Sequence, residues 1–196
     1  MGVTVPPSAG TRAIISLVGM PGSGKSTVGR HVARHLGLPF VDTDHLIEQR
    51  IGCSIRDYFE TQGEAAFRDV EQVVVDEVTR MAGHVVATGG GAVLREPNRL
   101  ALCDRTTVVY LRATPEDLAR RLRHDTHRPL LQRNDGDPLR RLRSLFQERD
   151  PLYRRTALFV IETGRPSVHS LVNMVLMQLE LAGVVPVAAA PGVAHQ

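Results

Sequence analysis

The residues with the clearest chemistry form a glycine-rich segment near the start of the chain. GMPGSGKST, at 19–27, matches the pattern GxxxxGK[ST] in full. It follows an apolar run and opens a segment with helical spacing, the context in which such a loop directs backbone N–H groups at phosphate oxygens. Lys25 can then reach the β- and γ-phosphates, and the Ser26 hydroxyl can ligate Mg²⁺. The segment predicts a nucleoside triphosphate site formed by Gly22, Ser23, Gly24, Lys25, Ser26 and Thr27.

This loop leaves several classes of nucleotide-binding protein open. A dinucleotide fingerprint does not fit, because Thr27 stands where GxGxxG needs its last glycine. We find no NKxD-like guanine reader, which a GTPase would need, and no apolar run ending in Asp-Glu, which an AAA-type motor would need. A chain of 196 residues suits a small-molecule kinase. The alternative at this point is a glycine-rich turn with a chance lysine.

Two carboxylates, Asp42 and Asp44, follow the apolar run 39–41. Residues i and i+2 of an extended segment share a face, so both side chains can point toward the phosphate loop. One could help hold Mg²⁺ or accept a hydroxyl proton, and the other could hydrogen-bond substrate hydroxyls. The alternative is that Asp44 caps a helix beginning at His45 and that the other acid is solvated.

Two further motifs could bind a second substrate. Arg68 and Glu71 stand one helical turn apart in FRDVE, 67–71. They could form a surface ion pair worth about 0.2–0.5 kcal/mol, or Glu71 could hold Arg68 as a fork for a substrate carboxylate. The run Gly89, Gly90, Gly91 ends a later apolar segment. It suggests backbone packed against a ligand, or else a flexible turn.

Arginine is concentrated in the second half of the chain. Of the 24 cationic side chains 23 are arginine, and eleven of these fall between 120 and 155 against five acids. RLRHDTHRPLL, at 121–131, runs from a helical stretch into a polar loop and has the character of a lid. Its Arg128 could neutralise a transferring phosphoryl group, and Arg149 adds a cation near the site. RNA binding is the competing use, but aromatic residues are 4% of the chain and no RNA-binding signature is present.

The elements that must position these residues are short apolar runs alternating with longer amphipathic segments. Continuous apolar runs are typical of strands buried on both faces, and ligands of such folds sit at the carboxyl ends of the strands. Strands are expected at 13–18, 39–41, 84–87, 106–111 and 158–161. Helices are expected at 25–36, 63–81 and 168–181, with another beginning at Thr114 and Pro115. An apolar stripe on the second helix comprises Phe67, Val70, Val74, Val78 and Met81.

This alternation predicts an α/β fold: a P-loop three-layer sandwich with a five-stranded parallel sheet, helices on both faces and a mobile lid at about 122–137. We expect one domain at 13–182, a disordered leader at 1–12 and a flexible tail at 183–196. The chain is 42% apolar and 23% charged, which excludes disordered, collagen-like and disulfide-scaffold classes. Cys53 and Cys103 suit two reduced thiols of a cytoplasmic protein, and no apolar stretch approaches the ~20 residues of a membrane span.

In this order, GMPGSGKSTVGR, VDTD, FRDVE, TGGG, RPLL and RDPLY resemble the motifs of the shikimate kinase family over roughly residues 14–175. The resemblance implies ATP-dependent phosphorylation of the shikimate 3-hydroxyl, in the aromatic amino-acid pathway, on a nucleoside monophosphate kinase-like fold. It implies that Asp44 binds substrate hydroxyls, that Arg68 and Arg149 bind the substrate carboxylate, and that Gly90 contacts the substrate through its backbone.

For the nucleotide, the resemblance implies that Asp42 lies near Mg²⁺ and the attacking hydroxyl. It assigns Arg128 to ATP from the lid, and Arg121 and Arg165 to adenine. The residues agree with this reading, because a substrate with a carboxylate and several hydroxyls needs an arginine fork, an aspartate and a backbone contact. We expect ATP and shikimate as substrates, Mg²⁺ held by Ser26 and Asp42, no nucleic-acid or membrane partner, and a monomer.

Three other functions remain as alternatives. A kinase of another polyhydroxy acid, such as gluconate, would share the phosphate loop but should not need FRDVE and TGGG. A catalytically silent nucleotide-binding regulator would be indicated by loss of Lys25, Asp42 or Arg128, and all three are present. An arginine-rich nucleic-acid binder should lose affinity steeply with salt.

Overall fold

The central sheet has five parallel strands. The computed structural model describes residues 13–122 and 137–186, and the strands are β1 (Ile15–Val18), β2 (Phe40–Asp42), β3 (Val85–Ala87), β4 (Thr107–Arg112) and β5 (Phe159–Glu162). Their order across the sheet is β2-β3-β1-β4-β5, and every neighbouring pair is parallel. The predicted five-stranded parallel sheet is confirmed, with each strand within two residues of its expected position.

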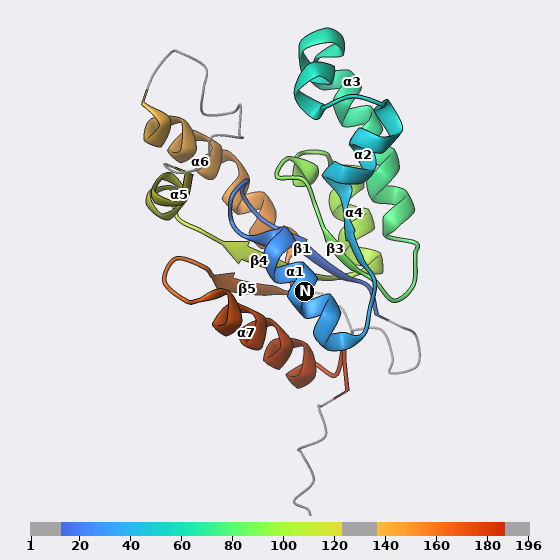
Figure 1. Cartoon of the computed structure of the whole chain (residues 1–196), viewed down its shortest axis with the longest axis vertical. Coiled ribbons are helices and arrows are strands. Elements are labelled where there is room, and N and C mark those ends of the chain that lie inside the picture. Colours follow the sequence, from blue (N-terminus) through green and yellow to red (C-terminus); the bar gives the residue numbers. More distant parts are fainter. Residues whose placement is uncertain (1–12, 123–136, 187–196) are drawn as a thin grey trace, which may run out of the picture.

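One face of the sheet is covered by α1 (Lys25–Leu36) and α7 (Val168–Leu181) (Figure 1). Their apolar residues pack against side chains of β1, β3, β4 and β5 in one continuous core that includes Val32 and Val175. The helix α1 is capped at its amino end by Gly24 of the phosphate loop and at its carboxyl end by Gly37, where φ is +64°. This core therefore holds the amino terminus of α1 at the carboxyl end of β1.

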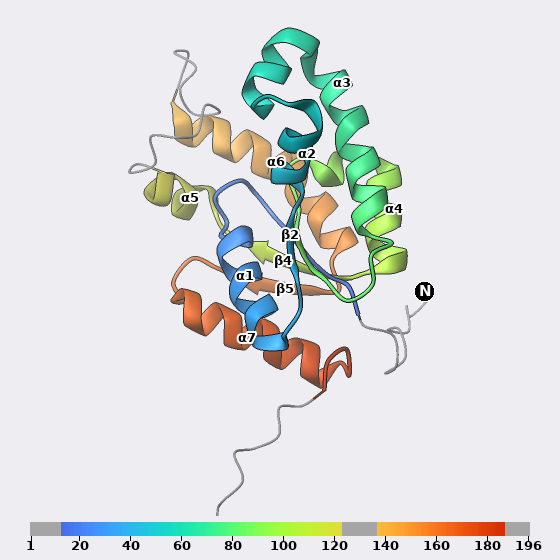
Figure 2. The same ribbon diagram turned by 45° about the vertical axis from the view of Figure 1, so that its right-hand side comes forward.

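The other face is covered by α3 (Ile55–Val78), α4 (Glu96–Arg105), α5 (Pro115–Leu122) and α6 (Pro138–Thr156), with α2 (Thr43–Ile51) beside α3 (Figure 2). A short 3₁₀ turn, η1 (Ala92–Leu94), follows the three glycines. Two apolar cores lie here, one under α4, α5 and α6 and the other between α2, α3 and the sheet. Helices on both faces complete the predicted three-layer arrangement.

The helix α3 bends sharply at Gly63, whose φ of 82° and ψ of 172° are not helical. The expected helix 63–81 thus begins at this kink and ends three residues early, at Val78. Met81 lies beyond the helix and is 42% exposed, so its place in the apolar stripe was wrong, whereas Phe67, Val74 and Val78 are buried. The kink folds the first half of α3 back toward the second half. Eight residues of straight helix rise about 12 Å, but the rings of Phe59 and Phe67, eight residues apart, have their centroids only 4.5 Å apart.

Several expectations fall on residues outside the described ranges. They are the leader 1–12, nearly all of the lid at about 122–137 with Arg128, and most of the tail 183–196. Within the described ranges, no helix combines the length and apolar character needed to traverse a lipid bilayer. Cys53 and Cys103 are free thiols.

Candidate active site

The phosphate loop joins β1 to α1, and hydrogen bonds between its own residues hold its shape. The Lys25 ammonium donates to the carbonyls of Gly19 and Met20 at 2.8 and 3.0 Å. A Cβ on Gly19 would lie 2.5 Å from the Leu111 carbonyl oxygen, so only glycine fits there. Ser23 is fully buried, and its hydroxyl has no hydrogen-bond partner within the described structure. The loop is a preformed cradle with a buried cation at its centre.

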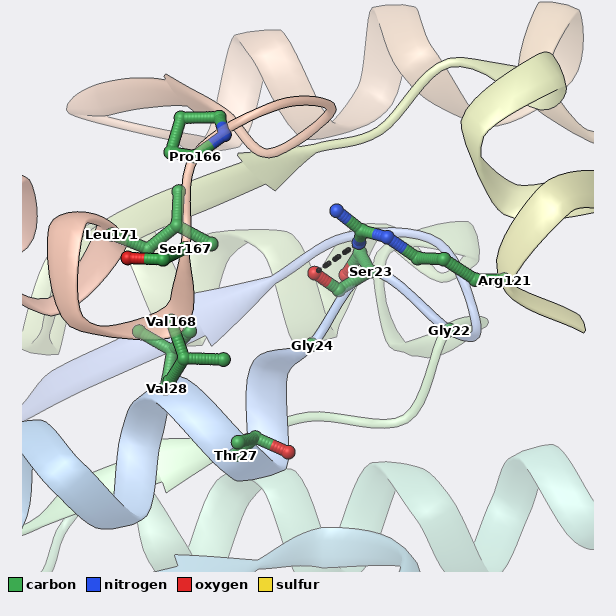
Figure 3. A pocket seen from close by; sticks show the side chains of 10 residues that line it. All are labelled: Gly22, Ser23, Gly24, Thr27, Val28, Arg121, Pro166, Ser167, Val168 and Leu171. Atoms are coloured by element: carbon green, nitrogen blue, oxygen red, sulfur yellow. Dashed lines mark hydrogen bonds between the residues drawn. The ribbon is translucent and has the colours of Figure 1, made fainter. Parts of the chain in front are cut away.

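A cavity of about 390 Å³ opens beside this loop. Figure 3 shows Arg121 reaching over the loop toward Ser23, with Pro166 and Ser167 across from it. The Arg121 guanidinium donates to the carbonyls of Thr163 and Ser23, which ties α5 to the loop after β5. The lining residues are Gly22, Ser23, Gly24, Thr27, Val28, Arg121, Pro166, Ser167, Val168 and Leu171.

This cavity brings the predicted nucleotide residues of the loop together with Arg121. The lining does not include Arg165, which is exposed. Its neighbour Pro166 faces the cavity instead. A chamber bounded by apolar side chains, an arginine and loop glycines has the composition of a site for a nucleotide base and its phosphates.

Asp42 lies at the junction of β2 and α2, where it accepts two hydrogen bonds. Its Oδ2 accepts from the Ser26 hydroxyl at 2.6 Å, and its Oδ1 accepts from the Asp44 backbone N–H at 3.1 Å. The expectation that Asp42 and Asp44 share a face of an extended segment was wrong, because α2 begins at Thr43 and Asp44 lies in its first turn. Asp44 is not the cap of a helix at His45 either, since Asp42 is the N-cap of α2.

The side-chain oxygens of Ser26 and Asp42 are suitable ligands for a magnesium ion. Both are oxygen ligands, which Mg²⁺ prefers, and Mg²⁺ usually takes only one or two protein ligands and completes its shell with water and phosphate. Within the described parts of the chain, no cluster of three or more His, Cys, Asp or Glu residues could hold a metal by itself. A site of two protein oxygens beside a phosphate loop is therefore consistent with a metal that arrives with a nucleotide.

Arg68 and Glu71 form a buried pair, so the surface alternative was wrong. The Arg68 side chain is 12% exposed and that of Glu71 1%, and Arg68 Nη1 donates to Glu71 Oε2 at 2.7 Å. Burial raises the pKa of Glu71 above its ordinary 4.5, and the charge of Arg68 opposes that rise. The guanidinium also donates to Glu64 and lies 5.9 Å from the Phe59 ring. These contacts fix Arg68 on α3.

The three glycines make room for the side chains around them. A Cβ on Gly89 would lie 2.5 Å from Asp44 Oδ1 and 3.0 Å from Glu71 Oε1. A Cβ on Gly91 would overlap the Arg68 guanidinium. The Gly89 N–H donates to Thr43 Oγ1 at 2.9 Å. This part of the run is thus an ordered turn packed against the acidic and basic side chains that the motifs predicted.

The middle glycine joins this turn to two other parts of the site. A Cβ on Gly90 would lie 2.6 Å from the ring of Pro21, in the phosphate loop. Its carbonyl accepts hydrogen bonds from Arg149 Nη1 at 3.2 Å and from the Tyr153 hydroxyl at 2.5 Å. Arg149 thus lies at the site, as expected. Tyr153, the last residue of RDPLY, also bonds to this turn, and nothing in the motif alone indicates a role for it.

The arrangement has two neighbouring halves. One is the cavity with the phosphate loop, and the other is a group of polar side chains around the glycine turn: Asp44, Arg68, Glu71 and Arg149. Ser26 and Asp42 connect the halves, because one stands at the start of α1 and the other at the end of β2. Two guanidiniums and an aspartate beside a phosphate loop can hold an anionic, hydroxylated molecule while a phosphoryl group is transferred to it.

Comparisons with known proteins agree with this geometry. The family model described as shikimate kinase matches residues 21–180. A shikimate kinase of Paracidovorax citrulli (strain AAC00-1) is 58% identical over 180 residues, which cover 90% of this chain and 97% of the relative. A solved shikimate kinase from Acinetobacter baumannii, in complex with shikimate, is 45% identical with a TM-score of 0.81 and covers 87% of this chain and 94% of its own.

The same fold also occurs in a kinase with a different name. A gluconokinase from Sinorhizobium meliloti 1021 superposes with a TM-score of 0.52 at 20% identity, over 88% of this chain and 95% of its own. At that identity the likeness concerns the fold alone.

Proposed function

The chain belongs to the shikimate kinase family, and on that basis we propose that it phosphorylates the 3-hydroxyl of shikimate with ATP, giving shikimate 3-phosphate and ADP. The observation that carries this proposal is the glycine turn at 89–91. Arg68 packs on Gly91, Arg149 bonds to the carbonyl of Gly90, and Asp44 lies against Gly89. The same turn touches Pro21 of the phosphate loop. An acceptor held at this turn would therefore lie beside the phosphates.

The acceptor is bound by charge and by shape. Arg68 and Arg149 bind its carboxylate, and Glu71 keeps Arg68 in place through their hydrogen bond. Asp44 accepts hydrogen bonds from the acceptor's hydroxyls, and the Gly90 backbone supplies a further contact. Because the guanidiniums are already held by buried or partly buried partners, little side-chain freedom is lost on binding.

Phosphoryl transfer then needs positioning and electrostatic stabilisation more than covalent chemistry. Lys25 moves from its backbone carbonyls to the β- and γ-phosphates. Asp42 orients the attacking hydroxyl or accepts its proton. Ser26 and Asp42 would hold Mg²⁺, which would neutralise charge on the phosphate oxygens. Arg128, which lies outside the described residues, is proposed to neutralise the same phosphate charge from the lid.

Three further properties are part of the proposal: Mg²⁺ is required, the protein is a monomer and it works in the cytoplasm. Monomer is the default because, within residues 13–122 and 137–186, the large apolar side chains that are at least 40% exposed are spread over several elements. Such scattered residues are normal on a monomer surface. They are Val73, Met81, Leu100, Leu158, Val160, Val168, Met177 and Leu181.

ADP release from Mg-ATP tests the function directly. Parallel reactions contain shikimate, gluconate or no acceptor. We expect turnover that depends on shikimate and a gluconate rate equal to the rate without acceptor. Slow ADP release indifferent to shikimate would keep the phosphate loop but overturn the substrate assignment.

Arg68→Ala tests the division of roles. We expect a rise of about 10- to 150-fold in the shikimate KM, the range of a lost charge-assisted hydrogen bond, and a KM for ATP within about twofold of the native value. The buried Glu71 can take up a proton when its partner is removed, because burial already raises its pKa. Arg56→Ala is the matched control, since Arg56 pairs with Glu60 on the exposed side of the same helix. Equal effects of Arg68→Ala on both KM values would contradict the assignment.

A further inference from the structure

Tyr153 is fully buried at the centre of the substrate half of the site. Its hydroxyl donates to the Gly90 carbonyl at 2.5 Å. Burial raises its pKa well above the ordinary value of 10, so the hydroxyl remains a donor throughout the working pH range. A hydroxyl bonded in this way, on a residue without exposed surface, is aimed at the protein backbone and not at a ligand.

The same carbonyl oxygen also accepts from Arg149. Arg149 and Tyr153 are four residues apart on α6, so their side chains project from the same side of the helix. A carbonyl oxygen has two lone pairs, and the two hydrogen bonds occupy both. Arg149 Nε is buried without a protein hydrogen-bond partner among the described residues. The guanidinium therefore retains donor capacity that its contact with Gly90 does not use.

The ring of Tyr153 is held as firmly as its hydroxyl. It stacks on the ring of Tyr110, with centroids 4.8 Å apart. Tyr110 in turn donates to Asp150 at 2.9 Å, and Asp150 also accepts from Arg112 and Arg154. Asp150 directly follows Arg149 in α6. The sheet thus fixes the turn of helix that carries Arg149 through one carboxylate and one aromatic stack.

We propose that Tyr153 is a positioning residue for substrate binding, which holds the Gly90 carbonyl so that the glycine turn and the Arg149 guanidinium keep one fixed geometry. This rests on the proposed function, in which Gly90 and Arg149 contact the acceptor. Without the Tyr153 hydroxyl, the Gly90 carbonyl can rotate toward Arg149 and form a stronger hydrogen bond with its guanidinium. Arg149 then has to break that contact before it binds an anion, so affinity for the acceptor falls while nucleotide binding is unchanged.

Tyr153→Phe and Tyr110→Phe form a matched pair for the test. Each removes one hydroxyl from the same stacked pair of rings, but only the first hydroxyl bonds to Gly90. Isothermal titration of shikimate into the full chain, without nucleotide, gives the Kd separately from the binding stoichiometry. We expect Tyr153→Phe to weaken shikimate binding about tenfold, equivalent to about 1.4 kcal/mol. Tyr110→Phe should stay within about twofold, because Arg112 and Arg154 still hold Asp150 when the Tyr110 hydroxyl is removed. The KM for ATP should be unchanged in both variants.

The stoichiometry separates positioning from folding. A merely structural role for Tyr153 would lower the fraction of chains that bind and leave the Kd of the folded fraction native, which would overturn the proposal. An equal loss of affinity in Tyr110→Phe would overturn it as well. Native protein that fails to bind shikimate would instead contradict the proposed function.

A double-mutant cycle with Arg149→Ala adds an independent arm. If Tyr153 acts through Arg149, its hydroxyl should matter less once the guanidinium is gone, so the two effects on the Kd are not additive. Strict additivity would show that Tyr153 does not act through Arg149.

Discussion

At the scale of single residues, Ser26 and Asp42 show how a hydrogen bond can prepare a metal site. The Ser26 hydroxyl donates a hydrogen bond to Asp42 Oδ2, so the lone pairs of Ser26 Oγ point away from Asp42. Asp42 Oδ1 is occupied by the Asp44 N–H at the start of α2. Both oxygens of the carboxylate are thus fixed before any cation binds. This arrangement reduces the reorganisation that metal binding would need.

Ser26→Ala should therefore affect metal use more than acceptor use. We expect the Mg²⁺ concentration for half-maximal activity at fixed ATP to rise at least about tenfold, because even the loss of a residue that only supports a metal ligand costs about 10- to 100-fold in metal affinity. The Kd for shikimate measured without nucleotide should not change. A Mg²⁺ titration of ADP release checks this, and an unaltered Mg²⁺ dependence would contradict the assignment of Ser26.

At the scale of elements, the kink of α3 connects backbone conformation to the substrate site. It folds the first half of the helix so that Phe59 reaches both Phe67 and the Arg68 guanidinium. The φ and ψ of Gly63 fall in a region of backbone conformation that is essentially open to glycine only. A side chain there would meet no heavy atom within 4 Å, so the constraint comes from the backbone alone.

Gly63→Ala tests this constraint. We expect the free energy of unfolding to fall by about 2–3 kcal/mol, which is about 4–12 °C in Tm for a chain of this size. Gly52→Ala is the control, since Gly52 is left-handed at φ 72° and also has open space around it, and it should cost only about 1 kcal/mol. A rise in Tm for Gly63→Ala, as expected for alanine in a continuous helix, would show that the kink is dispensable.

Asp76 joins the end of α3 to the end of α4. Hydrogen bonds from Arg80 and from Arg105 lower its pKa from 3.8 to about 2. A carboxyl whose pKa is lower in the folded chain stabilises the fold above its unfolded pKa, and that stability is lost as the pH falls through the folded value. The contribution of Asp76 should thus be nearly complete above pH about 4 and be lost as the pH falls through about 2.

Urea denaturation of native protein and Asp76→Asn over this range measures that contribution. The difference between their free energies of unfolding should be nearly constant above pH about 4 and shrink toward zero as the pH falls through about 2. A difference that does not change with pH would mean that the ion pairs of Asp76 do not stabilise the fold.

The elements also show which parts of the sequence were informative. The strands were found because their apolar runs are short and bounded by turn residues, and this length favours a buried strand over a helix. Thr114 caps α5 as expected by accepting from the Asp117 N–H. The helix α6 was not predicted, because it is rich in arginine and contains Pro151. The role of Tyr153 depends on its i, i+4 spacing from Arg149 on that helix, so it could not be inferred from the motif alone.

At the scale of the whole molecule, the substrate site is assembled from segments far apart in the chain. Asp44 comes from α2, Arg68 from α3, Gly90 from the turn after β3 and Arg149 from α6. Sequence motifs identified these residues but could not place them, because the strand order β2-β3-β1-β4-β5 brings the ends of β1, β2 and β3 together. That Asp44 lies in the first turn of α2, and not on an extended strand, is likewise a consequence of packing, because the Gly89 N–H donates to Thr43 Oγ1 at the start of this helix.

A ligand held by four such segments should stabilise the fold as a unit. Shikimate at 100 times its Kd should add about 2.7 kcal/mol, which raises Tm by about 5–11 °C for a chain of this size. Differential scanning calorimetry measures the shift, with gluconate at the same concentration as the control for a different polyhydroxy acid. In Arg68→Ala the shift with shikimate should largely disappear, whereas the shift with Mg-ATP should remain, since the nucleotide cavity lies on the other half of the site. An equal shift with gluconate would mean that the two guanidiniums and Asp44 recognise any hydroxylated carboxylate, and substrate selection would then have to occur in the transfer step.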